Sequence, residues 1–167
     1  MPLDVRGAAY ARESDEVQVA LVTLSHASLS EPLRFSSDSA DRLSIEPLRY
    51  GTRSRGLEFV FALKGAIVPD DKKETPPRAA LVFDNTGADM VTALRGLETR
   101  ATVKIELVLA SSPDVVFQAF NWLRVIHAGY DAQSVTLDLS FDDYASRQFG
   151  RKATKQRFPG LFGIPNA

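Results

Sequence analysis

The sequence predicts an α+β fold that is mostly antiparallel β-sheet, with two short helices beside the sheet and an extended arm at the C-terminus. In several segments apolar residues occupy every second position, and short polar turns join these segments, as in a sheet with one buried face. Two other stretches have good helix formers or helical spacing. With 167 residues the chain can bury a real core, so we expect one domain over residues 1–146 and an arm over residues 147–167.

The helices are expected at the N-terminus and in the middle of the chain. Residues 3–16 contain several alanines and charged residues, although Gly7 lowers the stability of a helix there by about 1 kcal/mol. Residues 88–98 carry apolar side chains at helical spacing, and Asp84 or Asn85 can cap the start of this helix.

Strands are expected where β-branched, aromatic and other apolar residues alternate with polar ones. The alternation is clearest over residues 101–109, whose odd positions are apolar, so one face of this strand must be buried. Residues 57–64 also have an apolar residue at every second position, which places Leu57, Phe59, Phe61 and Leu63 on one face of the strand. The full set of expected strands is 17–24, 32–35, 57–64, 79–83, 101–109, 115–128 and 134–141.

The connecting segments refine this prediction. Residues 43–50 are expected to be extended around Pro47, a residue that disfavours a central position in a sheet. Residues 69–77 form a charged loop, and the apolar phase of the long strand shifts near residues 120–122, which predicts a bulge or a break there. Because short turns join consecutive strands, we expect an antiparallel meander, closed or sandwiched to bury its apolar face.

No group of residues has the spacing of a catalytic, cofactor or metal site. His26 and His127 lie in a turn and in a strand, without carboxylates at ligand spacing. Residues 51–56 have the outer glycines of a phosphate loop, but Leu57 and Glu58 stand where lysine and serine or threonine are required, so a flexible basic loop is the better interpretation. No serine lies in a hydrolase elbow, and two acidic pairs match no calcium loop. These pairs are Asp70-Asp71 and Asp142-Asp143.

Composition limits the classes of partner. A net charge of −1 gives no overall attraction to nucleic acid or to an anionic membrane. The absence of cysteine excludes disulfides, thiolate metal sites and cysteine nucleophiles. No apolar run approaches the roughly 20 residues that span a bilayer, and the first residues lack the pattern of a secretion signal. We therefore expect a protein that is made in the cytoplasm, is not inserted in a membrane and is not an enzyme.

The C-terminal arm has the clearest pattern of a docking segment. Five basic residues and no acidic one lie between Arg147 and Arg157, followed by apolar residues that glycine and proline separate. We hypothesise that this segment contacts a neighbouring subunit. A tail folded back on its own domain is one alternative, and nucleic-acid binding by these bases with Arg49, Arg53 and Arg55 is another. The expected contact residues are Arg151, Lys152, Lys155, Arg157, Phe158, Pro159, Leu161 and Phe162.

Several segments, in order, resemble one family of small tail proteins of long-tailed (siphovirus-type) bacteriophages and prophages, long known only as a domain of unknown function. The resemblance covers nearly the whole chain and is most specific at its end. The segments that carry it are residues 19–26, 31–34, 55–61, 77–85, 103–114 and 157–163.

The resemblance implies a structural protein of the virion, located at the tail tip in the distal-tail or baseplate-hub region, with no enzymatic activity. Its fold would be a tail-tube-like β-barrel or sandwich. Copies would form a homo-oligomeric ring, a trimer or a hexamer, that connects the tail tube to the tip and lets DNA pass through its channel. The other partners would be tail-tube, baseplate and tail-tip proteins. An open sheet edge supplies a physical reason for such assembly, because a ring can cover each edge with the next subunit.

Overall fold

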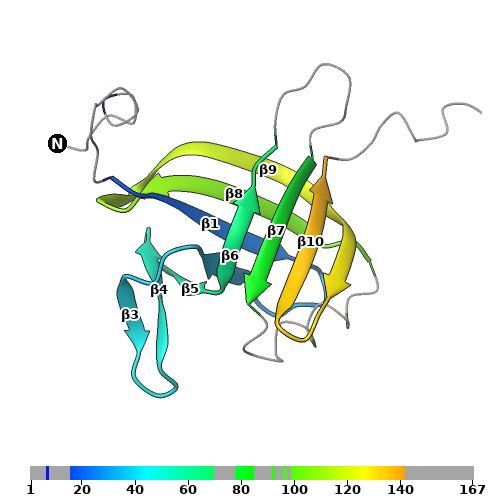
Figure 1. Ribbon diagram of the computed structural model, residues 1–167, viewed down its shortest axis with the longest axis horizontal. Helices are drawn as coiled ribbons and strands as arrows, with labels where there is room; N and C mark the ends of the chain where they lie inside the picture. The colour runs from blue at the N-terminus through cyan, green and yellow to red at the C-terminus, as the bar shows by residue number, and fades with distance from the viewer. Residues whose placement is uncertain are drawn as a thin grey trace, which may run out of the picture.

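The computed structural model describes residues 7, 16–69, 78–84, 92, 96 and 99–141, and this part of the chain is almost entirely β-structure (Figure 1). The two predicted helices, over residues 3–16 and 88–98, lie outside the described residues apart from isolated positions. The described strands are β1 (Gln18–Ser25), β2 (Leu33–Ser36), β3 (Asp41–Ser44), β4 (Arg49–Ser54), β5 (Leu57–Phe61), β6 (Leu63–Ile67), β7 (Arg78–Asp84), β8 (Thr102–Leu109), β9 (Ser112–Tyr130) and β10 (Ser134–Ser140).

These strands form one sheet in the order β3-β4-β5-β2-β1-β8-β9-β10-β7-β6. All neighbouring pairs are antiparallel except β2 and β5, which are parallel. The predicted meander is therefore confirmed in its antiparallel character, with one parallel exception. The order has two ends, β3 and β6, so the described strands make an open mixed sheet, and they do not form the closed barrel that was one expected arrangement.

The sheet nevertheless folds over itself at Ala62, the one residue between β5 and β6. Its backbone N–H donates to the carbonyl oxygen of Ser36 on β2 (3.3 Å), and its own carbonyl accepts from the N–H of Asp84 on β7 (2.7 Å). Ala62 thus joins strands from distant places in the order. In Figure 1, β7 and β10 cross in front of β1 and β8 as a result.

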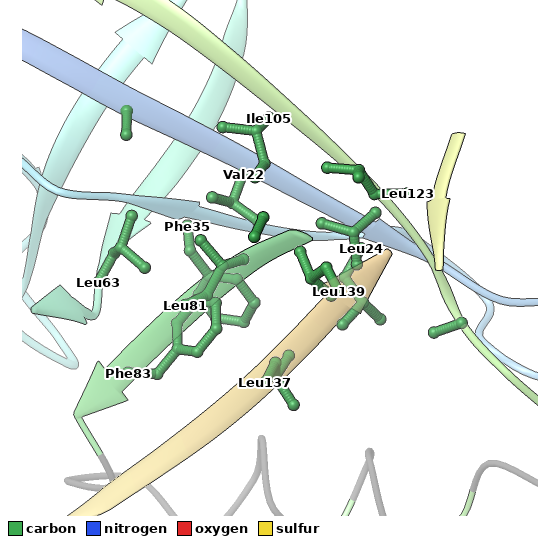
Figure 2. Close-up of a cluster of buried hydrophobic side chains, with 14 of the residues drawn as sticks. Val22, Leu24, Phe35, Leu63, Leu81, Phe83, Ile105, Leu123, Leu137 and Leu139 are labelled. Atoms are coloured by element: carbon green, nitrogen blue, oxygen red, sulfur yellow. The ribbon is translucent and has the colours of Figure 1, made fainter. Parts of the chain in front are cut away.

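The main core lies between these crossing strands (Figure 2). It takes alternate side chains from β1, β7, β8 and β10, in agreement with the period of two in their sequences. The rings of Phe35 and Phe83 meet edge to face, with centroids 5.0 Å apart, a favoured geometry for aromatic pairs. Leu81, Val103, Ile105 and others around them are fully buried. The core residues labelled in the figure are Val22, Leu24, Phe35, Leu63, Leu81, Phe83, Ile105, Leu123, Leu137 and Leu139.

A second, smaller cluster lies on the opposite face of β1. There Val19 and Leu21 pack with Phe59 of β5 and Val108 of β8. Strand β1 is therefore buried on both faces, which explains why residues 19–22 are all apolar and do not alternate with polar residues.

The β3–β4 hairpin replaces the extended segment that the sequence predicted for residues 43–50. Residues 45–48 form its turn, with a cis peptide bond before Pro47, so the proline does stay out of the sheet ladder. Gly51 begins the close contact of β4 with β5. A Cβ atom there would stand 1.9 Å from the carbonyl oxygen of Phe59, so only glycine fits.

The predicted bulge near residues 120–122 is confirmed. The pairing of β8 with β9 passes from Val103↔Leu123 to Ile105↔Phe120, which leaves one extra residue on β9. Trp122 in this bulge has a φ of 67°.

The alternation predicted for residues 57–64 is only half right. Phe59 and Leu63 are buried, but Leu57 and Phe61, the first and last residues of β5, are 40% and 43% exposed.

Candidate interaction surface

The expected contact residues of the C-terminal arm, from Arg151 to Phe162, lie outside the described residues, as do the acidic pairs at residues 70–71 and 142–143. The described part of the chain therefore supplies other surfaces. Among its residues no group of three or more histidine, aspartate or glutamate side chains is arranged to hold a metal ion.

The two histidines occupy unrelated places. Both ring nitrogens of His26 lie 2.6 Å from hydroxyl oxygens, Nδ1 from Ser28 and Nε2 from Thr99. The bond to Thr99 connects the loop after β1 with the segment before β8. His127 is exposed on β9, opposite Asp138 in the register with β10.

The basic segment at residues 51–56 is not the flexible loop that the sequence predicted. Residues 51–54 belong to β4, and only Arg55 and Gly56 turn the chain, both with positive φ (52° and 74°). The error arose because the glycines and arginines resemble a loop, whereas their strand character comes from pairing with β3 and β5.

This turn is fixed to the β8–β9 hairpin by polar contacts. The Ser54 hydroxyl donates to the carbonyl oxygen of Pro113 (2.7 Å), and the Arg55 backbone N–H donates to the Asp114 carboxylate. The Arg55 guanidinium donates to both carboxylate oxygens of Glu106, at 2.8 and 2.9 Å. Together these bonds attach the β4–β5 turn to Glu106 of β8 and to the first residues of β9.

Glu106 is the most buried charge in this contact, with a side chain 6% exposed. The hydrogen bond from Arg55 lowers the pKa of the Glu106 carboxyl. Burial of the carboxyl opposes this shift, and Lys104, whose Nζ lies 2.8 Å away, assists it. The same hydrogen bond raises the pKa of Arg55. A bidentate pair of this kind fixes orientation as well as charge. Arg53 similarly pairs with Glu58 at 3.3 Å, so acidic partners occupy two of the three arginines that favoured nucleic-acid binding.

The long strand β9 presents an unusual edge. It pairs with β8 along most of its length, but with β10 only from Arg124 onward. No described strand pairs with its second edge before Arg124. Residues 115–123 on this edge contain no charged residue, although exposed strand edges normally carry charges or prolines that prevent unwanted pairing. We call residues 115–123 the β9 edge.

Trp122 stands at the end of the β9 edge and is 78% exposed. It is the single tryptophan of the chain. A bulky side chain rarely adopts a positive φ, and such strain often marks functional positions. Here the bulge displaces the indole from the alternation of the strand and presents it to solvent.

A second exposed apolar group lies on the β3–β4 hairpin. Ile45, Leu48 and Tyr50 are 70%, 59% and 43% exposed, and the first two lie in the turn itself. We call these three residues the hairpin tip. In Figure 1 the hairpin extends to the lower left, away from the end of β9 beside β10.

A hollow between β6, β7, β9 and β10 has a volume of about 220 Å³ and is lined by Ile67, Ile126, Arg78 and Asp138 among others. This volume is below the roughly 300–1,000 Å³ typical of small-molecule sites. The exposed apolar surfaces are therefore the better candidates for function.

Sequence reasoning found the bulge but missed its most exposed side chain. A lone tryptophan at a phase shift, inside a run of nine residues without charge, is the signal that could have identified this surface. The hairpin tip had no comparable signal, because residues 43–50 read as one extended segment.

Comparisons with known proteins find a likeness of fold. No protein-family model and no curated protein matches the chain. Among solved structures, a chain from the virion of a native gene transfer agent (GTA) particle has a TM-score of 0.57 and 14% sequence identity. The alignment covers 90% of this chain and 48% of that one, so this chain spans about half the length of its structural neighbour. In the part of the chain that the structure describes, no helix is long and apolar enough to cross a membrane.

Proposed function

We propose that this chain is a structural subunit of a phage-type virion, located at the tail tip in the distal-tail or baseplate-hub region. Copies form a ring of three or six subunits that connects the tail tube to the tip and lets DNA pass. The chain acts through its surfaces and not through catalysis. It is made in the host cytoplasm and carried in the virion.

The fold carries this proposal. The fold is similar to that of a chain from a gene transfer agent virion over 90% of the present chain. This similarity supports a structural role in a phage-type particle. At 14% identity the likeness concerns the fold alone. The position at the tail tip rests on the resemblance of the sequence to small tail proteins, above all at residues 157–163.

The described surface supports assembly independently of any relative. Along the β9 edge no described strand pairs with the backbone, and its side chains carry no charge. Trp122 lies near the end of this edge, and the hairpin tip lies elsewhere; both expose large apolar side chains. Monomeric proteins normally avoid such features, because edges and apolar patches promote association. A subunit that is buried in a particle needs them.

Particle composition tests the proposal. Mass spectrometry of purified particles from a strain that produces them should find the chain in the tail fraction, with a copy number that is a multiple of three. Deleting its gene should stop tail completion, as seen by electron microscopy. Complete, infectious tails that lack the chain would overturn the proposal.

The arm has its own test. Truncation after Arg157 removes Phe158, Pro159, Leu161 and Phe162, and we expect the β domain to remain folded while assembly fails. Circular dichroism of the purified truncated protein checks the fold, and complementation of the gene deletion checks assembly. Infectious particles built with the truncated chain would contradict the role of the arm.

A further inference from the structure

We propose that the β9 edge and Trp122 form a docking site for the β3–β4 hairpin of a second copy of this chain. This inference rests on the proposed function only in expecting that copies meet. It assigns a specific surface to each side of their contact.

The site has the chemistry of a strand acceptor. Nine residues of β9, from Val115 to Leu123, lack charge, and no described strand pairs with their second edge. An added strand would satisfy the backbone groups of this edge, and side chains at alternate positions would set specificity. Trp122 at the end of the edge is 78% exposed, and tryptophan is among the residues that most often dominate interface energies.

The hairpin has the matching features. Strand β3 ends the sheet order and pairs with β4 alone, so its outer edge has no described partner either. Directly after β3, Ile45 and Leu48 expose 70% and 59% of their surface. Pairing of β3 with the β9 edge would cover two open edges and bring an apolar turn beside Trp122 in one contact.

The hairpin of the same copy cannot be the occupant. Ser54 and Arg55, at one end of β4, are bound to Pro113 and Asp114 at the start of β9. Ile45 and Leu48 of the hairpin tip precede Arg49, and Tyr50 follows it directly, so the tip lies at the other end of β4. Figure 1 shows the hairpin directed away from β9, so a second copy must supply it.

The two surfaces differ, which makes the contact heterologous. Each copy uses its β9 edge toward one neighbour and its hairpin toward the other. Such head-to-tail contacts close into rings or continue as filaments. A symmetric dimer, in which the same surface meets itself, would use only one of the two.

Two variants and one control test the proposal with purified protein. Trp122→Gly removes the indole, and glycine accepts the positive φ, so folding should not suffer. Ile45→Ser combined with Leu48→Ser removes the apolar turn. The control is Ile67→Ser, because Ile67 is 69% exposed, like Ile45, and lies outside both surfaces.

Sedimentation at rising concentration should show that the wild type and the control self-associate. Both site variants should associate at least about tenfold more weakly. Their thermal unfolding midpoints should stay unchanged, or rise for Trp122→Gly. A wild type that remains monomeric, or a Trp122→Gly protein that associates like the wild type, would overturn the proposal.

Mixing the two defective variants gives the sharpest result. The hairpin variant keeps an intact β9 edge, and the Trp122→Gly protein keeps an intact hairpin, so the mixture should form a heterodimer. Only the hairpin variant contains tryptophan, and its fluorescence should shift to shorter wavelength as the indole is covered. A mixture without dimer or shift would rule out the hairpin as occupant. Absence of the chain from particles would instead contradict the proposed function and leave this result standing.

Discussion

The two faces of β1 are covered in different ways. On one face, Ala20, Val22 and Leu24 join the large core under β7 and β10. On the other, Val19 and Leu21 meet a smaller cluster, in which the described residues supply two further buried apolar side chains, Phe59 and Val108. Hydrogen bonds between polar groups complete the contact on this second face.

The polar contacts surround the smaller cluster. The hydroxyls of Ser36 and Thr52 share a buried hydrogen bond of 2.7 Å. The bonds from Ser54 and Arg55 to the β8–β9 hairpin stand at the end of β4. Apolar burial is strong but not directional, whereas paired hydrogen bonds fix angles. We infer that packing holds the large core together, and that polar bonds orient the layer formed by β3, β4 and β5.

The largest effect should come from the main core. Ile105→Ala or Leu137→Ala removes a side chain that is at most 1% exposed, and each should lower the free energy of unfolding by about 2–5 kcal/mol. Denaturant unfolding measures the loss. Ile67→Ala, at a side chain 69% exposed and outside both docking surfaces, is the control and should change stability by less than about 0.5 kcal/mol. Unchanged stability in both core variants would contradict the burial of these strand faces.

The next largest loss of stability should come from breaking the Arg55–Glu106 contact. Arg55→Ala leaves Glu106, 6% exposed, with Lys104 alone. We expect a loss of about 2 kcal/mol, below the 3–5 kcal/mol of fully buried pairs, because Arg55 itself is 36% exposed. Hydrogen exchange should show the loss first in β4 and β5. Arg55→Lys keeps the charge without the bidentate bond, so its stability should lie between those of the wild type and Arg55→Ala. If hydrogen exchange increased equally in β7 and β10, the main core and the β3–β5 layer would not be stabilised separately.

The pH dependence of stability sharpens the same contrast. The pKa of Glu106 in the folded protein lies below its ordinary value of 4.5, so the ionised carboxylate stabilises the fold above that value. This contribution is lost as the pH falls through the lowered pKa. The difference in unfolding free energy between wild type and Glu106→Gln should therefore be largest at neutral pH and shrink below pH 4.5. A difference that is constant with pH would show that the carboxylate charge is not what stabilises this side.

The same contrast explains what the sequence could predict. Strands β7 and β10, which border the main core, have regular alternation of buried and half-buried residues, because each has one face in a single apolar core. In β8 the predicted alternation holds as far as Ile105, but Glu106 and Val108 are buried as well, because Val108 packs in the second cluster. The existence and approximate bounds of β7, β8 and β10 follow from the sequence, and so do the buried positions of β7 and β10. The bulge in β9 does too, because it restores an apolar phase that the sequence breaks.

The β3–β5 layer could not be predicted in the same way. Its strands contain Gly51, Arg53 and Ser54, whose places depend on partners distant in sequence, such as Pro113. Leu57 and Phe61 share a two-residue period with the buried Phe59 and Leu63, yet both are exposed. The docking surfaces were missed for a related reason, because exposure of Trp122 and Ile45 depends on which strands stay unpaired.

The smallest expected effect separates orientation from mere charge pairing. Arg53 and Glu58 face each other at 3.3 Å across β4 and β5, as Arg55 and Glu106 do at 2.8 Å, but both side chains of the first pair are 56% exposed. Solvent screens such a pair, so Arg53→Ala should cost less than about 1 kcal/mol. Added salt should reduce even this, since exposed charges are the more easily screened. Denaturant unfolding of Arg53→Ala and Arg55→Ala at low and at high salt measures both effects. If Arg53→Ala cost as much as Arg55→Ala, total charge and not the buried bidentate contact would hold the hairpin layer in place.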